Sequence, residues 1–155
     1  MVKVFILYDS KYGNTKLAAM SIMEGIKENK DIVVEIGYVK DVDSKKVANF
    51  DAIILGAPNH MGRPSRTMKK FVDMLAKLDL KSKKVAVFGT YSGKIRDPDR
   101  AVKKLEKIVQ EKMPNQNLVL PSLSIRVKGV HGPIREGELP KCVDFGKKIT
   151  TQLEQ

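Results

Sequence analysis

The chain has 155 residues, of which 42% are hydrophobic and 30% charged, a balance typical of a globular protein. The length predicts one domain over residues 1–155 with a sizeable core. A single cysteine excludes an internal disulfide. The N-terminus lacks the pattern of a signal peptide, and no apolar run approaches the ~18 residues that span a bilayer. We therefore expect a cytoplasmic protein without a membrane segment.

The net charge is unusually positive, since 29 Lys and Arg residues stand against 18 Asp and Glu residues and give +11. Such a balance suggests nucleic acid, an anionic membrane or an acidic protein as partner. The lysines are scattered in short groups such as "KENK", "MKKF" and "GKKIT", and none forms a dense block with interleaved aromatics. This scatter favours solvated helix faces over a nucleic-acid surface, and leaves an acidic partner open.

The first half of the chain alternates between apolar and amphipathic segments. Val2–Leu7 is a continuous apolar run that predicts a buried strand, and Thr15–Glu28 predicts a helix. Ile32–Val39 is rich in β-branched residues, and Ala52–Leu55 is a second buried run. A helix is predicted next, from an apolar stripe with three-and-four spacing: Met68, Phe71, Val72 and Leu75.

The second half continues the alternation. Val85–Phe88 predicts another buried strand, and Leu118–Val127 a last strand whose Pro121 suits an edge position. Between them a helix is predicted from Val102, Leu105 and Val109, ending near Pro114. A closing helix with Pro140 in its first turn is predicted from Cys142, Gly146, Ile149 and Leu153. We interpret Cys142 as a small core residue.

This order of elements predicts an α/β fold, a doubly wound five-stranded parallel sheet with helices on both faces. Ligands of such sheets bind beyond the carboxyl ends of the strands, where the strand order reverses. The loops after Leu7, Leu55 and Phe88 are therefore the places to search for a site.

All three loops carry unusual residues. "DSKYGNT" offers hydroxyl and amide groups, and its Gly13 allows close backbone approach at the start of a helix, where a phosphate would bind. It matches neither the dinucleotide motif nor the nucleoside-triphosphate motif, and a simple capped turn is the alternative. "GAPNHMGRP" places Met61 at an exposed tip, and "GTYSGKIRD" places Tyr91 among small residues. Together they predict a pocket for a phosphate with a flat ring beside it.

The motifs "YDSKYGNTKLAA", "NHMG" and "GTYSG" resemble the three flavin loops of the flavodoxin family, over the whole chain and in the short-chain form. "GAPN" and "GPIREGELPKCVDFGKKI" are similar to the flavodoxin domain of flavodiiron proteins in particular. The resemblance implies a flavodoxin-like fold and an FMN cofactor. The residues implied as cofactor-binding are Ser10, Lys11, Tyr12, Gly13, Asn14 and Thr15, then Pro58, Asn59, His60, Met61 and Gly62, then Gly89, Thr90, Tyr91, Ser92 and Gly93.

In this family the first loop holds the phosphate, the methionine touches the ring, and the third loop supplies a ring neighbour, here Tyr91. No catalytic side chain and no metal ligand is implied. The chain departs from the family in its basic charge and in having no tryptophan. Cations expected near the flavin edge are His60, Arg63, Lys94, Arg96 and His131. A basic rim would raise the potential of the second one-electron reduction and attract an acidic redox protein.

The resemblance implies an electron-transfer protein more than an enzyme with its own substrate. An FMN-dependent NAD(P)H:quinone or flavin reductase of the same fold is the alternative. A phosphorelay receiver is disfavoured, because Asp9 stands alone and Gly56-Ala57-Pro58 replaces the phosphoacceptor. A nucleic-acid-binding domain rests on charge alone.

Overall fold

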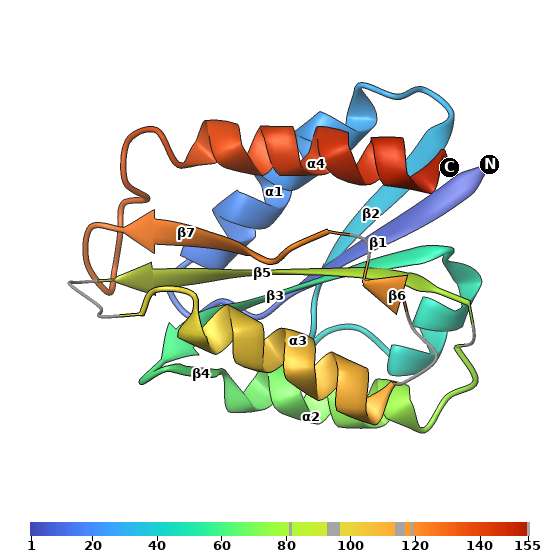
Figure 1. Cartoon of the computed structure of the whole chain (residues 1–155), viewed down its shortest axis with the longest axis horizontal. Helices are drawn as coiled ribbons and strands as arrows, with labels where there is room; N and C mark the ends of the chain where they lie inside the picture. Colours follow the sequence, from blue (N-terminus) through green and yellow to red (C-terminus); the bar gives the residue numbers. More distant parts are fainter. Residues whose placement is uncertain (81, 93–96, 114–116, 119, 155) are drawn as a thin grey trace.

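The computed structural model describes residues 1–80, 82–92, 97–113, 117–118 and 120–154. Its centre is a parallel sheet that runs in the order β2-β1-β3-β5 and ends in an edge position shared by β6 and β7 (Figure 1). The strands are β1 Val2–Tyr8, β2 Ile32–Tyr38, β3 Ala52–His60, β5 Lys84–Ser92, β6 Asn117–Leu118 and β7 Leu123–Val127. The chain therefore has the predicted doubly wound fold, with five strand positions.

Two helices cover each face of the sheet. In Figure 1, α1 and α4 lie above the sheet and α2 and α3 below it. The helices are α1 Asn14–Lys27, α2 Arg66–Ala76, α3 Arg100–Lys112 and α4 Leu139–Leu153, with a short 3-10 helix, η1, at Ser44–Asn49. Pro140 lies in the first turn of α4, as predicted. None of the helices in the described ranges is long and apolar enough to cross a bilayer.

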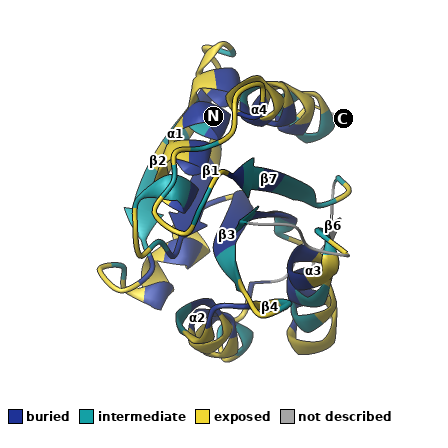
Figure 2. Cartoon of the chain, turned by 90° about the vertical axis from the view of Figure 1, so that its left-hand side faces the viewer, coloured by how far each residue is buried: buried dark blue, intermediate teal, exposed yellow. Residues whose placement is uncertain are grey.

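Each strand divides its side chains between two cores, because successive residues point to opposite faces of a sheet. Phe5 and Leu7 of β1 pack under α2 and α3, whereas Val4 and Ile6 pack under α1 and α4. Figure 2 shows the buried residues along the sheet and on the helix faces turned toward it. Cys142 is fully buried in the second core, as interpreted from the sequence, and burial raises the pKa of its thiol to about 12.

Helices α1 and α4 approach each other closely, because both carry a glycine at the crossing. A Cβ on Gly25 would overlap the carbonyl oxygen of Val143 and lie 3.2 Å from the Cα of Gly146. A Cβ on Gly146 would overlap the carbonyl oxygen of Ile22. The two backbones therefore touch where side chains would otherwise hold them apart.

The last strand differs from the prediction. We expected one strand over Leu118–Val127, but the edge position holds two short strands, β6 beside the start of β5 and β7 beside its end. Pro121 lies between them and has no N–H to donate. The next N–H, on Ser122, donates instead to Oε1 of Glu106 on α3, at 2.7 Å. A proline and a side-chain acceptor thus interrupt the ladder.

Candidate functional site

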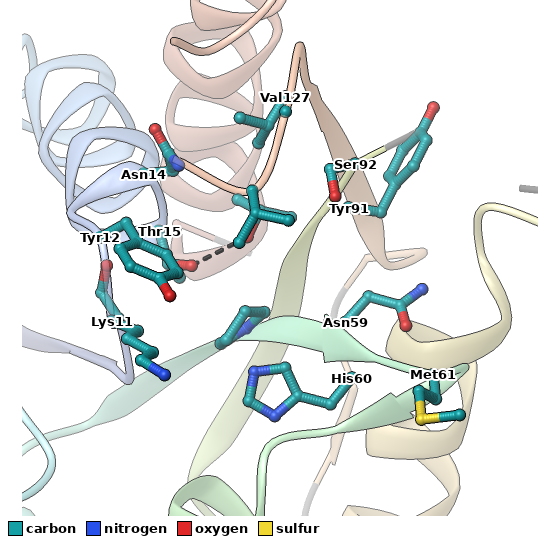
Figure 3. Close-up of a pocket in the computed structure, with 15 residues that line it drawn as sticks. Lys11, Tyr12, Asn14, Thr15, Asn59, His60, Met61, Tyr91, Ser92 and Val127 are labelled. Carbon is teal, nitrogen blue, oxygen red and sulfur yellow. Dashed lines mark hydrogen bonds between the residues drawn. The ribbon is translucent and has the colours of Figure 1, made fainter. Parts of the chain in front are cut away.

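A pocket of about 330 Å³ opens at the carboxyl end of the sheet, between the loops that follow β1, β3, β5 and β7 (Figure 3). Its size falls within the usual range for small-ligand sites. The residues that line it are Ser10, Lys11, Tyr12, Asn14, Thr15, Pro58, Asn59, His60, Met61, Thr90, Tyr91, Ser92, Val127, Gly129 and Val130. The three loops predicted from the sequence therefore meet at one site.

One end of the pocket is formed by the amino end of α1. Gly13 at the N-cap has φ 92°, a left-handed conformation that favours glycine, and its N–H donates to Oγ of Ser10 at 3.0 Å. No side chain caps this helix, and its first turn contains no acidic residue. Helix α2, in contrast, is capped by Ser65, whose Oγ accepts from the N–H of Met68. The α1 terminus thus offers free N–H groups and the positive end of a helix dipole.

A buried hydrogen bond fixes this helix end to the sheet. The hydroxyls of Thr15 on α1 and Thr90 on β5 lie 2.9 Å apart, and both side chains are almost fully buried. Because Thr15 is occupied in this way, its backbone N–H is a better candidate for a ligand contact than its hydroxyl. The bond also sets the distance between the first and third loops.

The other end of the pocket is formed by a tight hairpin. Strand β3 turns at Met61 and Gly62 into β4, Arg63–Pro64, which pairs antiparallel with it. Met61 has φ 55° and Gly62 has φ 82°, the two positive values of a type I′ turn. Met61 is 98% exposed, which confirms the predicted exposed tip. Figure 3 shows Met61 at the outer end of the site, far from Tyr12.

Asn59 connects the hairpin to the pocket. Its Oδ1 accepts from the N–H of Gly62 at 2.7 Å, which fixes the orientation of the side-chain amide. Its Nδ2 is buried and has no hydrogen-bond partner, the one such side-chain atom among the described residues. A buried donor without a partner costs about 1–3 kcal/mol, so an acceptor on a ligand would relieve a real penalty.

The end of β7 and the loop after it complete the pocket, and sequence reasoning did not include Val127, Gly129 and Val130. The ring of His131 meets that of Tyr12 edge-on, with centroids 4.1 Å apart. A Cβ on Gly132 would lie only 2.5 Å from Oδ1 of Asn14. The loop therefore leans on the first loop. Its position after the last parallel strand was the signal available in the sequence, because that strand ends at the same edge.

Twelve of the sixteen residues predicted for the site line this pocket. The other predicted positions are glycines: Gly13 and Gly62 form the two left-handed turns, and Gly89 is a close approach, since a Cβ there would lie 3.1 Å from the carbonyl oxygen of Ala57. Gly93 lies outside the described residues, as do Lys94 and Arg96 of the expected basic rim.

The two ends of the pocket differ in chemistry. The α1 end has polar groups and Lys11, whose Nζ lies 5.4 Å from the centre of the Tyr12 ring. The hairpin end has His60 and Tyr91, and Figure 3 shows Tyr12 and Tyr91 on opposite sides of the site. The arrangement can accept an elongated molecule with an anionic group at one end and a flat group at the other.

The model of the family described as "Flavodoxin domain" matches residues 5–129. A flavodoxin of Maridesulfovibrio salexigens is 32% identical over 157 residues, which cover 99% of this chain and all of that protein. A flavodoxin of Clostridium saccharobutylicum is 36% identical over 89 residues. That match spans 57% of this chain and about half, 56%, of that protein. An NAD(P)H dehydrogenase (quinone) of Archaeoglobus fulgidus is 32% identical over half of each chain.

Solved structures of flavodoxins and of a flavodiiron core are also similar to this chain. Oxidised flavodoxin 2 of Bacillus cereus superposes with a TM-score of 0.82 and 28% identity, over 97% of this chain and 99% of that one. A flavodiiron core of Synechocystis superposes with a TM-score of 0.78 and 18% identity, over 99% of this chain and 36% of that one. The second likeness concerns the fold alone.

Proposed function

Because the chain belongs to the flavodoxin family, we propose that it binds one FMN in this pocket and carries electrons between redox partners. The observation that carries the proposal is the uncapped amino end of α1, which opens onto the same pocket of about 330 Å³ that Tyr91 lines. FMN, when bound, supplies the electron chemistry, and the protein sets its position and surroundings.

At the α1 end, backbone N–H groups of the first helical turn would hold the phosphate, with the side chain of Asn14 beside them. Lys11 is the cation that lines this part of the pocket. Gly13 supports the proposal because its left-handed conformation turns the chain into the helix without a side chain in the way.

At the hairpin end, the free Nδ2 of Asn59 would donate to an acceptor at the edge of the ring. Tyr91 would lie against the ring, and His60 and Met61 would border it on the hairpin side. No described side chain is required to transfer a proton.

The second candidate is an NAD(P)H:quinone or flavin reductase. It is favoured by the partial likeness to the Archaeoglobus protein, which extends over half of each chain. This function needs a binding site for a second substrate beside the flavin. Steady consumption of NADPH with a quinone present would favour it over an electron carrier.

The test of the main proposal is titration of cofactor-free protein with FMN, followed by flavin fluorescence. We expect one FMN per chain, with a dissociation constant at or below the micromolar range, and weaker binding of riboflavin and FAD. Riboflavin lacks the phosphate, and FAD carries a further nucleotide for which no dinucleotide loop is present. Absence of binding at tens of micromolar FMN would overturn the proposal.

A further inference from the structure

Four cationic side chains gather beside the hairpin, on three elements. Arg63 lies on β4, Lys69 on α2, and Arg100 and Lys104 on α3. Figures 1 and 2 show β4 between α2 and α3. Burial lowers the pKa of the half-buried Lys104, and the positive charges of Arg100, Arg63 and Lys69 lower it further. The charges of Arg63, Lys69 and Arg100 therefore all act on Lys104.

These four cations form no ion pair within the part of the chain that the structure describes. The six ion pairs found there use Lys46, Lys107, Lys112, Lys141, Lys147 and Lys148. None includes the four cations. Asp97 and Asp99 stand at the start of α3, and within the described ranges neither carboxylate forms an ion pair with the four cations. Like charges without ion-pair partners lower the stability of the folded state. The cluster is therefore a candidate functional surface.

The cluster reaches the tip of the hairpin through Arg63 and Arg100. A Cβ on Gly62 would lie 3.1 Å from Cδ of Arg100, so the stem of that arginine covers the turn. Met61, next to it, projects a large apolar side chain into solvent from a left-handed backbone conformation. An L-residue in this conformation is strained by about 1 kcal/mol or more. An exposed apolar contact with charges around it has the anatomy of a protein interface.

We propose that Met61, Arg63, Lys69, Arg100 and Lys104, the basic hairpin surface, dock an acidic electron-transfer protein. The proposal rests on the electron-carrier function above. Charge complementarity requires a partner with a negatively charged surface, and it accelerates the association of the two proteins. The position of this surface indicates that the partner is an electron-transfer protein. Met61 also lines the pocket, so a partner centred on the hairpin tip would lie against the hairpin end of the pocket. In the productive complex the partner gives up one electron and the chain's cofactor takes it up.

The test measures docking directly, with and without FMN. The probe is a small acidic [2Fe–2S] ferredoxin, and its dissociation constant is measured by calorimetry with cofactor-free and with FMN-loaded protein. In the hairpin variant Arg63→Glu, Arg100→Glu and Lys104→Glu are combined. We expect at least tenfold weaker docking in both forms, and a weaker dependence on salt. Basic cytochrome c should dock more tightly to this variant than to the natural chain.

The matched control combines Lys30→Glu, Lys45→Glu and Lys77→Glu. These exposed lysines follow α1, lie in η1 and follow α2, toward the amino-terminal edge of the sheet, and the net charge changes equally. We expect the dissociation constant of the ferredoxin to change less than threefold in this control variant. Equal losses in both variants would overturn the proposal and leave only a general attraction. Intact ferredoxin docking in the hairpin variant would overturn it too.

Two further outcomes would replace the proposal. Loss of duplex DNA binding in the hairpin variant, without ferredoxin docking to the natural chain, would identify a nucleic-acid surface. A raised KM for NADPH, also without docking, would identify a nucleotide phosphate site of a reductase. FMN titration of the same variants keeps the two hypotheses apart: normal FMN binding without docking rejects the surface alone, and docking without FMN binding rejects the electron-carrier function.

Discussion

The oxygen and the nitrogen of the Asn59 side-chain amide have different roles. Its oxygen is held by the N–H of Gly62, and its nitrogen is buried without a partner. A ligand that accepts from Nδ2 would therefore act on the same side chain that positions the hairpin turn. We therefore expect ligand binding in the pocket to influence the conformation of Met61 and Gly62 through this one residue.

At the other end of the pocket, we expect Asn14→Asp to change protein stability and FMN affinity in opposite directions. A carboxylate in the first turn of α1 should stabilise the helix by about 0.3–1 kcal/mol through the helix dipole. It should also repel a phosphate a few ångströms away by about 1–4 kcal/mol. We expect FMN affinity to fall at least tenfold and riboflavin affinity to change less than threefold, both measured by fluorescence titration.

Asn49→Asp is the control for this change. Asn49 is exposed at the end of η1, away from the pocket, and undergoes the same replacement of an amide by a carboxylate. Its affinities for FMN and riboflavin should stay within twofold of the natural chain. Equal losses for both ligands in Asn14→Asp would contradict a phosphate site at α1.

Met61 offers a second test at this scale. Asn is the residue best suited to the first position of a type I′ turn before glycine, and the side chain of Met61 makes little contact that would be lost. Met61→Asn should therefore raise the free energy of unfolding by about 0.5–1 kcal/mol in urea denaturation. The same variant should bind the acidic ferredoxin more weakly.

The matched variant for comparison is Met74→Asn, since Met74 is also exposed but lies within α2. Asn is a poorer helix former than Met, so this change should lower stability by a few tenths of a kcal/mol. A loss of stability in Met61→Asn would show that the methionine side chain supports the fold, and would remove strain as an argument for its role.

At the scale of elements, the contact between α1 and α4 depends on two glycines. Gly146→Ala gains about 0.5–1 kcal/mol of helix propensity, but the new methyl group would overlap the backbone of Ile22. A clash with the backbone cannot be relieved by a rotamer change, so its cost should exceed the gain in helix propensity. We expect the free energy of unfolding to fall by more than about 2 kcal/mol.

Gly129→Ala is the corresponding control. A Cβ at Gly129 meets nothing within 4 Å. Its free energy of unfolding should stay within about 0.5 kcal/mol of the natural chain. A neutral or stabilising effect of Gly146→Ala would show that α1 and α4 can separate at little cost, contrary to the close crossing described above.

The elements also show what a sequence can and cannot predict. Continuous apolar runs such as Val85–Phe88 were sufficient for strands buried on both faces, and stripes such as Met68 to Leu75 for helices buried on one face. The hairpin of β3 and β4 and the division of the last strand leave no such pattern. Both depend on a few individual residues: the positive φ values of Met61 and Gly62 in the hairpin, and Pro121 with the Glu106 acceptor at the last strand.

The same limit applies to the site. Loops with glycine and hydroxyl residues were recognisable at the ends of the first, third and fourth strands. Val130 and Gly129 were not, because their place after the last strand was the available signal and no motif marked the residues themselves. The basic hairpin surface joins residues that are 37 and 41 positions apart, Arg63 with Arg100 and with Lys104. Only the folded chain brings them together.

At the scale of the whole molecule, the charge of +11 predicts an unusual response to salt. Self-repulsion among the cations opposes the compact state, and salt screens it over about 10 Å at 0.1 M. We expect the free energy of unfolding of the cofactor-free chain to rise by about 1 kcal/mol between 0.02 and 0.3 M sodium chloride. Urea denaturation at each salt concentration measures this change.

Chloride is preferable to phosphate in this experiment, because phosphate could bind at α1. The hairpin variant should show a smaller rise than the natural chain, since three of the repelling charges are reversed. A fall in stability with salt would mean that the ion pairs, such as that of Lys147 with Glu28, outweigh the repulsion.

The interrupted edge of the sheet has a consequence for behaviour at high concentration. An edge strand with a free row of N–H groups can template the addition of a strand from another molecule. Here Glu106 takes the N–H of Ser122, and Glu138 takes the N–H of Arg126 at 2.9 Å. The carbonyl oxygen of Arg126 accepts from the N–H of Arg135. Two glutamates and a returning segment of the chain thus occupy part of this edge, and we expect the edge to add strands from other molecules less readily.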